Sequence, residues 1–487
     1  MKVATRTLVA DALTPVRAYA ALREADPEGA SFLLESVVGG ERWGRWSILG
    51  YRPRYEAVLD RRGWKLRPGS GDPTGARLPS LEDLGGDPIA SSGPLFQRAR
   101  QEAGAPPPSM AARFAAAHVG YLAWDIVHLI DKVPPGSDAT WNEHFVPLAR
   151  FLGGATVVVF DALAQTVTIA AEDEADVERA LADLARAPSL AAIDVPDRTR
   201  IPAGVTTDLD DDAYRARVLR AKEYIAAGDA FQIVLARTFS VPRGGRDPFD
   251  VYRAMRLVNP SPYMYFLDLP PADGSSGERL RIAGASPETM VRLEDGAMTV
   301  RPLAGTRPRG KTPDEDARLE AELLADPKER AEHVMLIDLG RNDVGRVARI
   351  GSVELLRKME IERYSHVMHI VSEVRGQVPP EVPPLEVARA AFPAGTLSGA
   401  PKVRAMQIIR ELEARPRGIY GGAIGYVGAT GDLDLAIAIR TLVCKGDTFE
   451  VTAGAGIVEA SDPASEADET RNKARGVLCA IEAAPRR

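Results

Sequence analysis

Cysteines and long hydrophobic runs are scarce in this sequence. Its 487 residues include two cysteines, Cys444 and Cys479, which cannot build a disulfide framework and do not have the spacing of metal ligands. No apolar run approaches the roughly 20 residues that a membrane-spanning helix needs. The apolar stretch at the N-terminus is too short for a secretory signal. We therefore expect a cytoplasmic protein that does not enter the membrane.

An excess of positive charge is also missing. The formal net charge is −7, so there is no electrostatic reason to expect nucleic acid or an anionic membrane as a partner. The sequence has no Rossmann fingerprint, Walker loop, Ser/His/Asp signature or zinc-type cluster. With 45% hydrophobic and 26% charged residues, the composition is that of an ordinary globular protein.

The chain is long enough for two regions. A segment rich in Pro, Asp and Thr, from Ala187 to Asp212, has no sustained hydrophobic periodicity. We place the boundary there, between an N-terminal region at 1–200 and a second region at 201–487.

Strand-like segments of the second region follow one another across short connections that contain Gly and Asp. Examples are 281–286 with 290–303, and 422–428 with 433–443 and 448–456. Short connections favour antiparallel pairing. Helical patterns interrupt the strands without a repeating strand-helix-strand order, which predicts an α+β fold rather than a doubly wound sheet.

One predicted helix start carries a pair of carboxylates. Asp326 is a candidate cap and Pro327 occupies the first helical position. Glu329 and Glu332 follow, three residues apart, so both side chains lie on one face of the helix.

A second helix start repeats this arrangement near the C-terminus. Glu466 and Glu469 are three residues apart, and Lys473 lies one turn further on. Oxygen ligands of this kind suit Mg²⁺, which is usually held by a few carboxylates together with an anionic group of the substrate. The alternative for either pair is that Glu merely complements the helix dipole on a solvated face.

Other segments could hold an anion. In the predicted strand 433–443, Arg440 shares a face with small residues, so it could bind a carboxylate or be an ordinary surface arginine. The run Gly454, Ala455, Gly456 is predicted to be a tight turn, with or without an anion on its N–H groups. The glycine-rich segment 392–402 opens a helix and is a second candidate cradle.

Among the six histidines, His369 is the most suggestive. It shares a predicted strand face with Val367 and Val371. A half-buried histidine is more often a core residue than a catalyst, so this pattern alone leaves both readings open.

An ordered series of motifs covers the chain from about Ser31 to the C-terminus. They are LLES, GDAFQ, NPSPYMYF, GASPE, RPLAGTRPRG, AEHVMLIDLGRND, HIVS, FPAGTLSGAPK, GIYGG, GAGIV and SEADETRNKA. Together they resemble the chorismate-using enzymes and, within that family, most closely the large subunits that form anthranilate. The resemblance implies an α+β fold with a large antiparallel β-sandwich flanked by helices.

The resemblance also implies the roles of individual residues. Glu332 and Glu469 would ligate Mg²⁺, with Glu329 and Glu466 nearby, and the metal would grip the ring carboxylate of chorismate. The implied substrate-binding residues are Gly305, Thr306, Tyr420, Arg440, Gly454, Ala455, Gly456 and Lys473. The implied catalytic residues are Glu288 as the general acid for the departing C4 hydroxyl, His369 in the later loss of pyruvate, Gln232 and Thr396.

Two positions choose among relatives. Isochorismate and salicylate synthases carry a lysine where this chain has Gln232, because their nucleophile is water. Aminodeoxychorismate synthases typically carry a lysine where this chain has Ala304. The resemblance therefore implies the first step of tryptophan biosynthesis, in which chorismate and ammonia give anthranilate and pyruvate. The alternatives are an aminodeoxychorismate synthase and a non-catalytic tryptophan-binding paralogue.

The resemblance implies two further partners. The sequence has no glutaminase region, so a separate glutamine amidotransferase subunit would supply ammonia in a heteromer. L-tryptophan would act as a feedback inhibitor in a pocket made by two segments that could otherwise be plain core strands. The implied pocket residues are Leu34, Glu35, Ser36, Pro262, Tyr263 and Met264.

Overall fold

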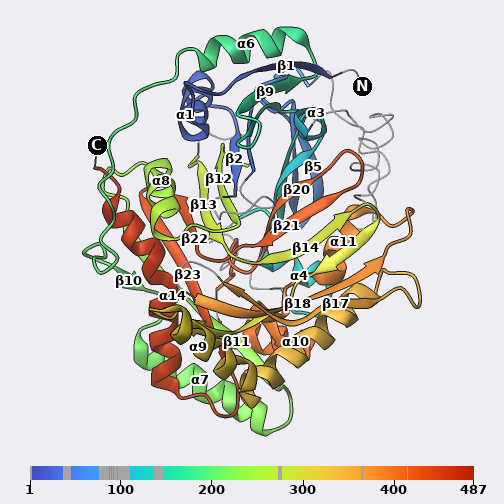
Figure 1. Cartoon of the computed structure of the whole chain (residues 1–487), viewed down its shortest axis with the longest axis vertical. Coiled ribbons are helices and arrows are strands. Elements are labelled where there is room, and N and C mark those ends of the chain that lie inside the picture. The colour runs from blue at the N-terminus through green and yellow to red at the C-terminus, as the bar shows by residue number, and fades with distance from the viewer. Residues whose placement is uncertain are drawn as a thin grey trace.

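Two antiparallel β-sheets form the centre of the molecule, and helices cover their outer faces (Figure 1). The computed structural model describes residues 3–36, 45–75, 87, 89, 92, 96, 110–135, 146–272, 277–363, 367–413 and 415–486. Every strand pairing within this part of the chain is antiparallel. The predicted α+β sandwich is confirmed.

The first sheet has twelve strands within the described residues. In spatial order they are β1 (Ala4–Val9), β9 (Thr166–Ala171), β8 (Thr156–Asp161), β3 (Trp46–Tyr51), β2 (Ser31–Glu35), β12 (Tyr263–Leu269), β13 (Leu280–Ser286), β22 (Thr441–Lys445), β23 (Thr448–Ile457), β11 (Gln232–Pro242) and β10 (Thr206–Thr207), with β19 (Gly399–Ala400) paired to β11.

The second sheet has eleven strands in the same part of the chain. In order they are β16 (Leu303–Pro308), β18 (Val367–Gln377), β15 (Ala297–Val300), β14 (Thr289–Glu294), β21 (Leu433–Ile437), β20 (Ala423–Val427), β6 (His118–Leu122), β7 (Ala149–Gly153), β4 (Tyr55–Asp60) and β5 (Gly63–Pro68), with β17 (Glu354–Arg363) paired to β18.

In Figure 1, α6 lies at one end of the molecule and α7, α9 and α10 lie at the other, while α14 runs along the side of the first sheet. The bounds of the helices are α1 (Pro15–Ala25), α3 (Met110–Ala115), the 3₁₀ helix η2 (Trp124–Ile126), α4 (Val127–Ile130), α6 (Glu174–Leu184), α7 (Asp211–Ala226), α8 (Pro248–Val258), α9 (Pro313–Ala325), α10 (Pro327–Gly345), α11 (Pro384–Ala391), α12 (Gly395–Ser398), α13 (Lys402–Leu412) and α14 (Pro463–Ala483). No helix among the described residues is both long and apolar enough to cross a membrane.

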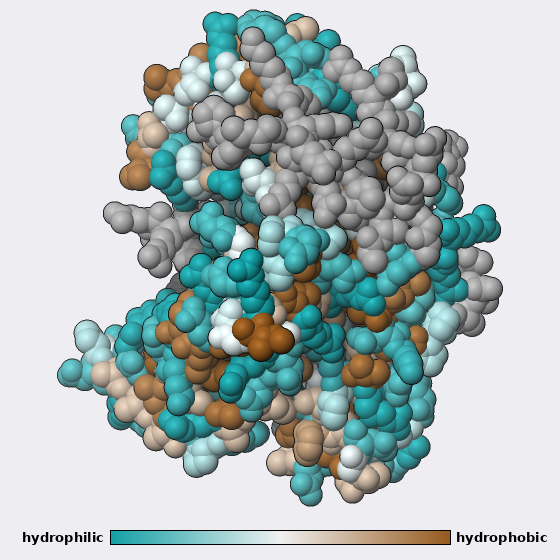
Figure 2. Space-filling view, turned by 90° about the vertical axis from the view of Figure 1, so that its right-hand side faces the viewer, coloured by the Kyte–Doolittle hydropathy of each residue, from teal (hydrophilic) through white to brown (hydrophobic). Residues whose placement is uncertain are grey.

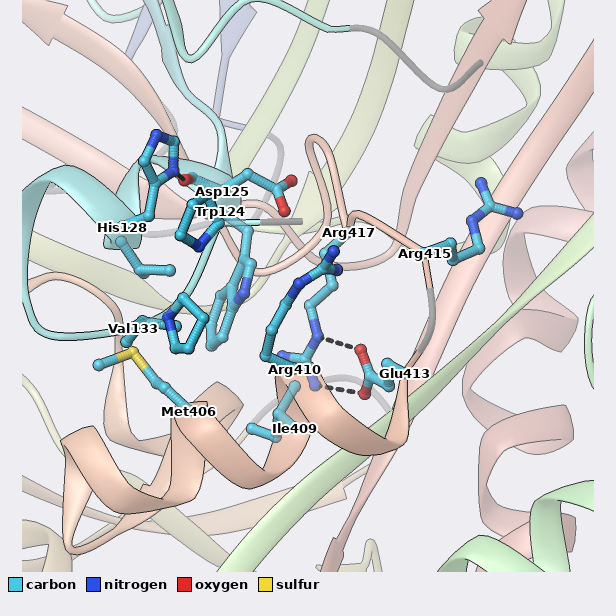
Figure 3. A pocket seen from close by; sticks show the side chains of 13 residues that line it. Trp124, Asp125, His128, Val133, Met406, Ile409, Arg410, Glu413, Arg415 and Arg417 are labelled. Atoms are coloured by element: carbon cyan, nitrogen blue, oxygen red, sulfur yellow. Dashed lines mark hydrogen bonds and ion pairs between the residues drawn. The ribbon is translucent and has the colours of Figure 1, made fainter. Parts of the chain in front are cut away.

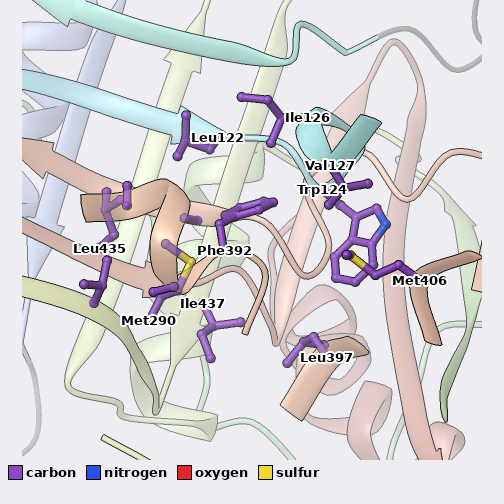
Figure 4. Close-up of a cluster of buried hydrophobic side chains, with 14 of the residues drawn as sticks. Leu122, Trp124, Ile126, Val127, Met290, Phe392, Leu397, Met406, Leu435 and Ile437 are labelled. Atoms are coloured by element: carbon purple, nitrogen blue, oxygen red, sulfur yellow. The ribbon is translucent and has the colours of Figure 1, made fainter. Parts of the chain in front are cut away.

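Alternation along the strands divides the core between the two faces of the first sheet. On β12, Tyr265 and Leu267 pack into the space between the sheets, whereas Met264 and Phe266 pack under the helices of the outer face. This is the period of two that a strand buried on both sides requires. A further cluster, which contains Met290 and Leu397, packs the opposite face of the second sheet against helices that include α11 and α13 (Figure 4). On the outside, hydrophobic residues are scattered among hydrophilic ones (Figure 2).

Both sheets combine strands from either side of residue 200. In the first sheet β2 pairs with β12, and in the second β6 pairs with β20. The division into 1–200 and 201–487 therefore stays a prediction about the sequence, and the strands of the two regions interleave in space.

Two of the expected elements differ from the structure. The single strand predicted at 433–443 is wrong, because β21 ends at Ile437 in the second sheet and β22 begins at Thr441 in the first. Between them Arg440 has φ +49°, a left-handed conformation that interrupts a strand. The turn predicted at 454–456 is also wrong, since these residues lie in β23 and neither glycine has a positive φ.

The two predicted helix starts are confirmed. Asp326 caps α10, and its side chain accepts hydrogen bonds from the backbone N–H groups of Lys328 and Glu329. Asp462 caps α14 and accepts from the N–H of Ser465. Both helices have proline at the first position, where no N–H partner is needed. The caps fix where each glutamate pair begins.

Candidate active site

A cavity of about 430 Å³ brings together residues from both sheets and from α10, α12 and α14. All but one of the predicted catalytic, substrate-binding and metal-binding residues line it. They are Gln232, Glu288, Gly305, Thr306, Glu329, Glu332, His369, Thr396, Tyr420, Arg440, Gly454, Gly456, Glu466, Glu469 and Lys473.

The exception is Ala455, which was expected to hold substrate. Its side chain is fully buried in a hydrophobic cluster that also contains Leu235 of β11 and Tyr214 of α7. Because successive residues of a strand point to opposite faces, the flanking Gly454 and Gly456 face the cavity and Ala455 faces away.

The two glycines are needed for close approach rather than for a turn. A Cβ atom on Gly454 would lie 2.8 Å from the hydroxyl of Tyr420, and one on Gly456 would lie 2.9 Å from the side-chain nitrogen of Gln232. Both distances are too short for carbon. Glycine at these positions therefore lets Tyr420 and Gln232 reach the cavity wall.

Glu288 is a buried carboxyl group with an unusual protonation equilibrium. It lies between β13 and β14, and burial raises its pKa to about 7. The Thr396 hydroxyl donates a hydrogen bond of 3.0 Å to Oε1, and this bond and the charges of Lys473 and Arg440 act in the opposite direction. The carboxyl group thus holds a proton close to neutral pH, as a general acid must.

His369 lies across the cavity on β18, where it pairs with Thr306 of β16. Its Nδ1 is 3.3 Å from the carbonyl oxygen of Gly305 and 2.9 Å from Oγ1 of Thr306. Because a carbonyl can only accept, the first contact assigns the proton to Nδ1 and leaves Nε2 as the acceptor. Burial lowers the pKa of His369 to about 4, so the ring is neutral at pH 7.

Two cations face the same space. The Nη1 group of Arg440 donates to Oδ1 of Asn259 at 3.2 Å, and the break between β21 and β22 directs the side chain toward the cavity. Lys473 Nζ donates to the carbonyl oxygen of Gly454 at 3.0 Å and lies 2.7 Å from Oε1 of Glu469. An anionic substrate would meet both positive charges.

The four glutamates of α10 and α14 place a group of acidic side chains at the same cavity. Burial, followed by the charge of Glu329, raises the pKa of Glu332, and Glu469 adds to this effect. Burial and Glu469 also raise the pKa of Glu466. Carboxylates that repel one another in this way favour a cation between them.

The carboxylates of this cavity fit a Mg²⁺ ion that takes some of its ligands from the protein and some from the substrate. No group of three or more His, Cys, Asp or Glu side chains in the described ranges is arranged to hold a metal by itself. Mg²⁺ is typically bound by one or two carboxylates, with water and an anionic substrate group completing the shell. Glu332 and Glu469 can supply these one or two carboxylate ligands.

Some lining residues were missed from the sequence. Lys328 immediately precedes Glu329 in the first turn of α10. A cation there opposes the helix dipole, which is the signal that could have drawn attention to it. The apolar wall residues Val234, Leu336 and Leu397 carry no such signal, because their sequence surroundings resemble those of any core residue.

Comparison with known proteins identifies the family. The family model described as chorismate binding enzyme matches residues 85–478. The chain belongs to the chorismate-binding enzymes. It is 44% identical to anthranilate synthase component 1 of Streptomyces coelicolor, over 97% of this chain and 87% of that protein. It is 41% identical to the protein of the same name from Cereibacter sphaeroides, over 98% and 93% of the two chains.

A solved structure extends the agreement to the fold of this chorismate-binding enzyme. The crystal structure of anthranilate synthase component I from Streptococcus pneumoniae superimposes with a TM-score of 0.73 at 31% identity. The match covers 97% of this chain and 99% of that one. The family resemblance and the implied β-sandwich are thereby confirmed.

The two segments predicted to bind tryptophan lie side by side in this chorismate-binding enzyme. Met264 of β12 is opposite Glu35 of β2, and the buried Glu35 carboxylate accepts a 2.6 Å bond from the Tyr252 hydroxyl. Ser36 Oγ is buried and has no hydrogen-bond partner within the described residues. A buried hydroxyl without a hydrogen-bond partner costs free energy, so a ligand that formed a hydrogen bond with it would bind more tightly.

The same segments reach toward the active site. The Tyr263 hydroxyl lies 2.8 Å from Oγ1 of Thr289, the residue after Glu288. Leu34 precedes Glu35 on β2, and Pro262 precedes Tyr263 at the start of β12. All six predicted tryptophan-binding residues therefore belong to one neighbourhood, and binding itself stays a prediction.

Proposed function

We propose that the chain is the large subunit of an anthranilate synthase and converts chorismate and ammonia into anthranilate, pyruvate and water. The observation that carries this proposal is the meeting of a protonated acid, a neutral histidine, two cations and four glutamates around one cavity. Relatives that cover nearly the whole chain and bear the name anthranilate synthase component 1 support it.

Glu288 would start the reaction as the general acid. Its proton passes to the C4 hydroxyl of chorismate, which leaves as water while ammonia bonds to C2. Thr396 holds the carboxyl group in place through its 3.0 Å hydrogen bond. Positioning of this kind contributes to the rate as well as the proton transfer itself.

On the nucleophile side of the cavity, a neutral amide occupies the position where an enzyme that uses water would carry a lysine as the base. Gln232 lies there, with its amide nitrogen 3.4 Å from Oε1 of Glu332, and Ala304 replaces the lysine that would attack the substrate directly. Ammonia needs no deprotonation to attack, so a neutral amide suffices. After addition, the new ammonium group loses one proton, which balances the proton that Glu288 gave to the leaving hydroxyl. The C3–O bond to the enolpyruvyl group then breaks, C2 loses its proton, the departing group takes up a proton to become pyruvate, and the ring becomes aromatic. The neutral His369 is the group that can take up or deliver a proton in this step.

Glu332 and Glu469 would hold Mg²⁺, with Glu329 and Glu466 in support. When bound, the ion supplies positive charge for the ring carboxylate of chorismate. Arg440 and Lys473 would bind substrate anionic groups on the other side, which orients the ring between Glu288 and His369.

A separate glutamine amidotransferase subunit would deliver ammonia. The relatives' designation as component 1 supports a heteromer. We expect glutamine to support turnover only when that subunit is present, whereas an ammonium salt supports turnover by this chain alone.

Anthranilate fluorescence tests the proposal directly. Purified protein with chorismate, Mg²⁺ and an ammonium salt should produce the fluorescent product and an equal amount of pyruvate. Loss of chorismate without pyruvate would instead indicate an aminodeoxychorismate synthase. Tryptophan binding by calorimetry without any turnover would indicate the non-catalytic paralogue.

Met264→Ala is expected to relieve inhibition by tryptophan with little loss of uninhibited activity. The buried methionine side chain would pack against the bound indole, so its removal weakens binding by about tenfold or more. The measurement is the tryptophan concentration that halves anthranilate formation. Ser36→Ala should act in the same direction by removing the unpartnered hydroxyl.

The matched control is Met298→Ala, which removes an equally buried methionine from β15 in the other sheet. It should lower the Tm and leave inhibition unchanged. Equal inhibition constants for the wild type, Met264→Ala and Ser36→Ala would refute this pocket.

A further inference from the structure

Arg417 is a buried arginine that does not line the active-site cavity. It lies between α13 and β20, and its side chain is 3% exposed. Its Nε donates to Oε2 of Glu413 at 2.7 Å, and Nη2 donates to Oε1 at 2.6 Å (Figure 3). This two-bond geometry fixes the plane of the guanidinium group.

The remaining donors of Arg417 reach the back of the cavity wall. Nη1 donates to the carbonyl oxygen of Leu397 at 2.8 Å, and Nη2 donates to that of Val234 at 2.8 Å. Leu397 and Val234 both line the cavity. The guanidinium carbon lies 4.3 Å from the ring centre of Trp124 and 5.7 Å from that of Tyr420, so aromatic rings restrict its movement.

Each bond restrains an element that carries a catalytic group. Leu397 follows Thr396 in α12, a helix of only four residues, which has too few internal hydrogen bonds to be rigid. Glu413 Oε1 also accepts from the backbone N–H of Ala236 at 2.7 Å. Ala236 and Val234 belong to β11, the strand that begins at Gln232.

We propose that Arg417 is a positioning residue, whose guanidinium group clamps α12 to β11 so that the Thr396 hydroxyl stays on Glu288. The inference rests on the proposed function in one respect, the role of Glu288 as the acid. Arg417 itself touches neither substrate nor reacting atoms.

The clamp has a consequence for protonation. The Thr396 hydrogen bond lowers the pKa of Glu288, against the larger effect of burial. If α12 moves, this bond weakens and the pKa of Glu288 rises. A purely structural ion pair would leave this pKa unchanged, because breaking it destabilises the fold without moving the Thr396 hydroxyl from Glu288.

Arg417→Lys tests the clamp. The lysine keeps the positive charge but cannot donate to Glu413, Leu397 and Val234 in the same geometry. We expect kcat to fall by about tenfold to a hundredfold, as for other small misplacements of catalytic groups, with a smaller change in KM. Because the pKa of Glu288 rises, the fall of kcat at alkaline pH should occur at higher pH than in the wild type. Thr396→Val, which removes the hydrogen bond to Glu288, should show the same shift.

A second readout does not depend on turnover. Glutamate labelled with ¹³C at the side-chain carboxyl allows Glu288 to be titrated by NMR, with Glu288→Gln identifying its signal. The Glu288 pKa should rise in Arg417→Lys and in Thr396→Val. An inactive wild type would overturn the proposed function, while this titration would still decide the role of Arg417.

Arg150→Lys is the matched control. Arg150 is also buried, bonds to Glu56 through two nitrogens, and donates to the carbonyl oxygen of Pro270 at 2.7 Å, but neither of these partners lines the cavity. This variant should lower the Tm and leave kcat and the Glu288 pKa unchanged.

A folded Arg417→Lys protein with the wild-type pKa for Glu288, or with a loss of activity no larger than that of Arg150→Lys, would overturn the proposal. If Arg417→Lys does not fold, Glu413→Gln decides. It retains the size of the side chain and weakens the hold on Arg417, so the Glu288 pKa should rise by a smaller amount. An unchanged pKa in Glu413→Gln would equally overturn the clamp.

Discussion

Glu288→Gln is expected to lower kcat by about two to four orders of magnitude, the usual contribution of a general acid. The amide has nearly the size of the carboxyl group and can still accept the hydrogen bond from Thr396, but it has no proton to give to the leaving hydroxyl. Rates of anthranilate formation under saturating chorismate and ammonium measure the effect. The Tm should change little, since burial already disfavours the charged form of this carboxyl group and the neutral amide has a similar size.

The kcat of the wild type is expected to decrease at alkaline pH. The acid works only in its protonated form, so kcat should fall as the pH rises through the Glu288 pKa of about 7. This limb should be absent from the residual activity of Glu288→Gln. Glu294→Gln is the control, since Glu294 lies at the exposed end of β14 and should keep both the rate and the limb. If Glu288→Gln kept the wild-type dependence of kcat on pH, Glu288 could not be the general acid.

The second large effect is expected for Glu469→Gln. If this carboxylate holds Mg²⁺, its loss should reduce turnover by about a hundredfold or more at moderate Mg²⁺, in line with the several kcal/mol that a catalytic metal contributes. Because the side chain is 45% exposed, the free energy of unfolding should change by less than about 1 kcal/mol. Calorimetric titration with Mg²⁺ should show weaker binding than in the wild type.

Asp468→Asn is the matched control on the same turn of α14. Its carboxylate pairs with Arg471 instead of lining the active-site cavity, so its loss should leave Mg²⁺ binding and turnover unchanged. Full activity of Glu469→Gln, or equal losses in both variants, would refute the assignment of Glu469 to the metal.

Local chemistry explains which parts of the fold could be predicted. A cap followed by proline, as at Asp326 and Pro327, determines a helix start through contacts within four residues. The break at Arg440 could not be found in this way, because both halves of 433–443 keep the alternation of a strand. Which sheet each half joins depends on partners far away in the sequence.

More of the candidate site than of the strand boundaries could be predicted, again because the signals are local in the sequence. Glu329, Glu332, Glu466 and Glu469 lie in short motifs whose spacing already indicates a shared face, and the family resemblance linked them to Glu288. The direction of the Ala455 side chain could not be predicted, because the expected turn left it open, whereas the period of the strand determines it. The bonds of Arg417 cross between elements and leave no trace in its neighbourhood along the chain.

The position of α14 has a consequence for the order in which the enzyme becomes active. This helix, at 463–483, brings Glu469 and Lys473 to a cavity whose other walls include residues as early in the chain as Gln232. A ribosome builds the chain from its N-terminus, so strands of both sheets can pair while α14 is still unmade. A chain that has not yet reached 463–483 therefore lacks two charged side chains of the cavity, so the cavity can be completed only after the strands of both sheets have been made.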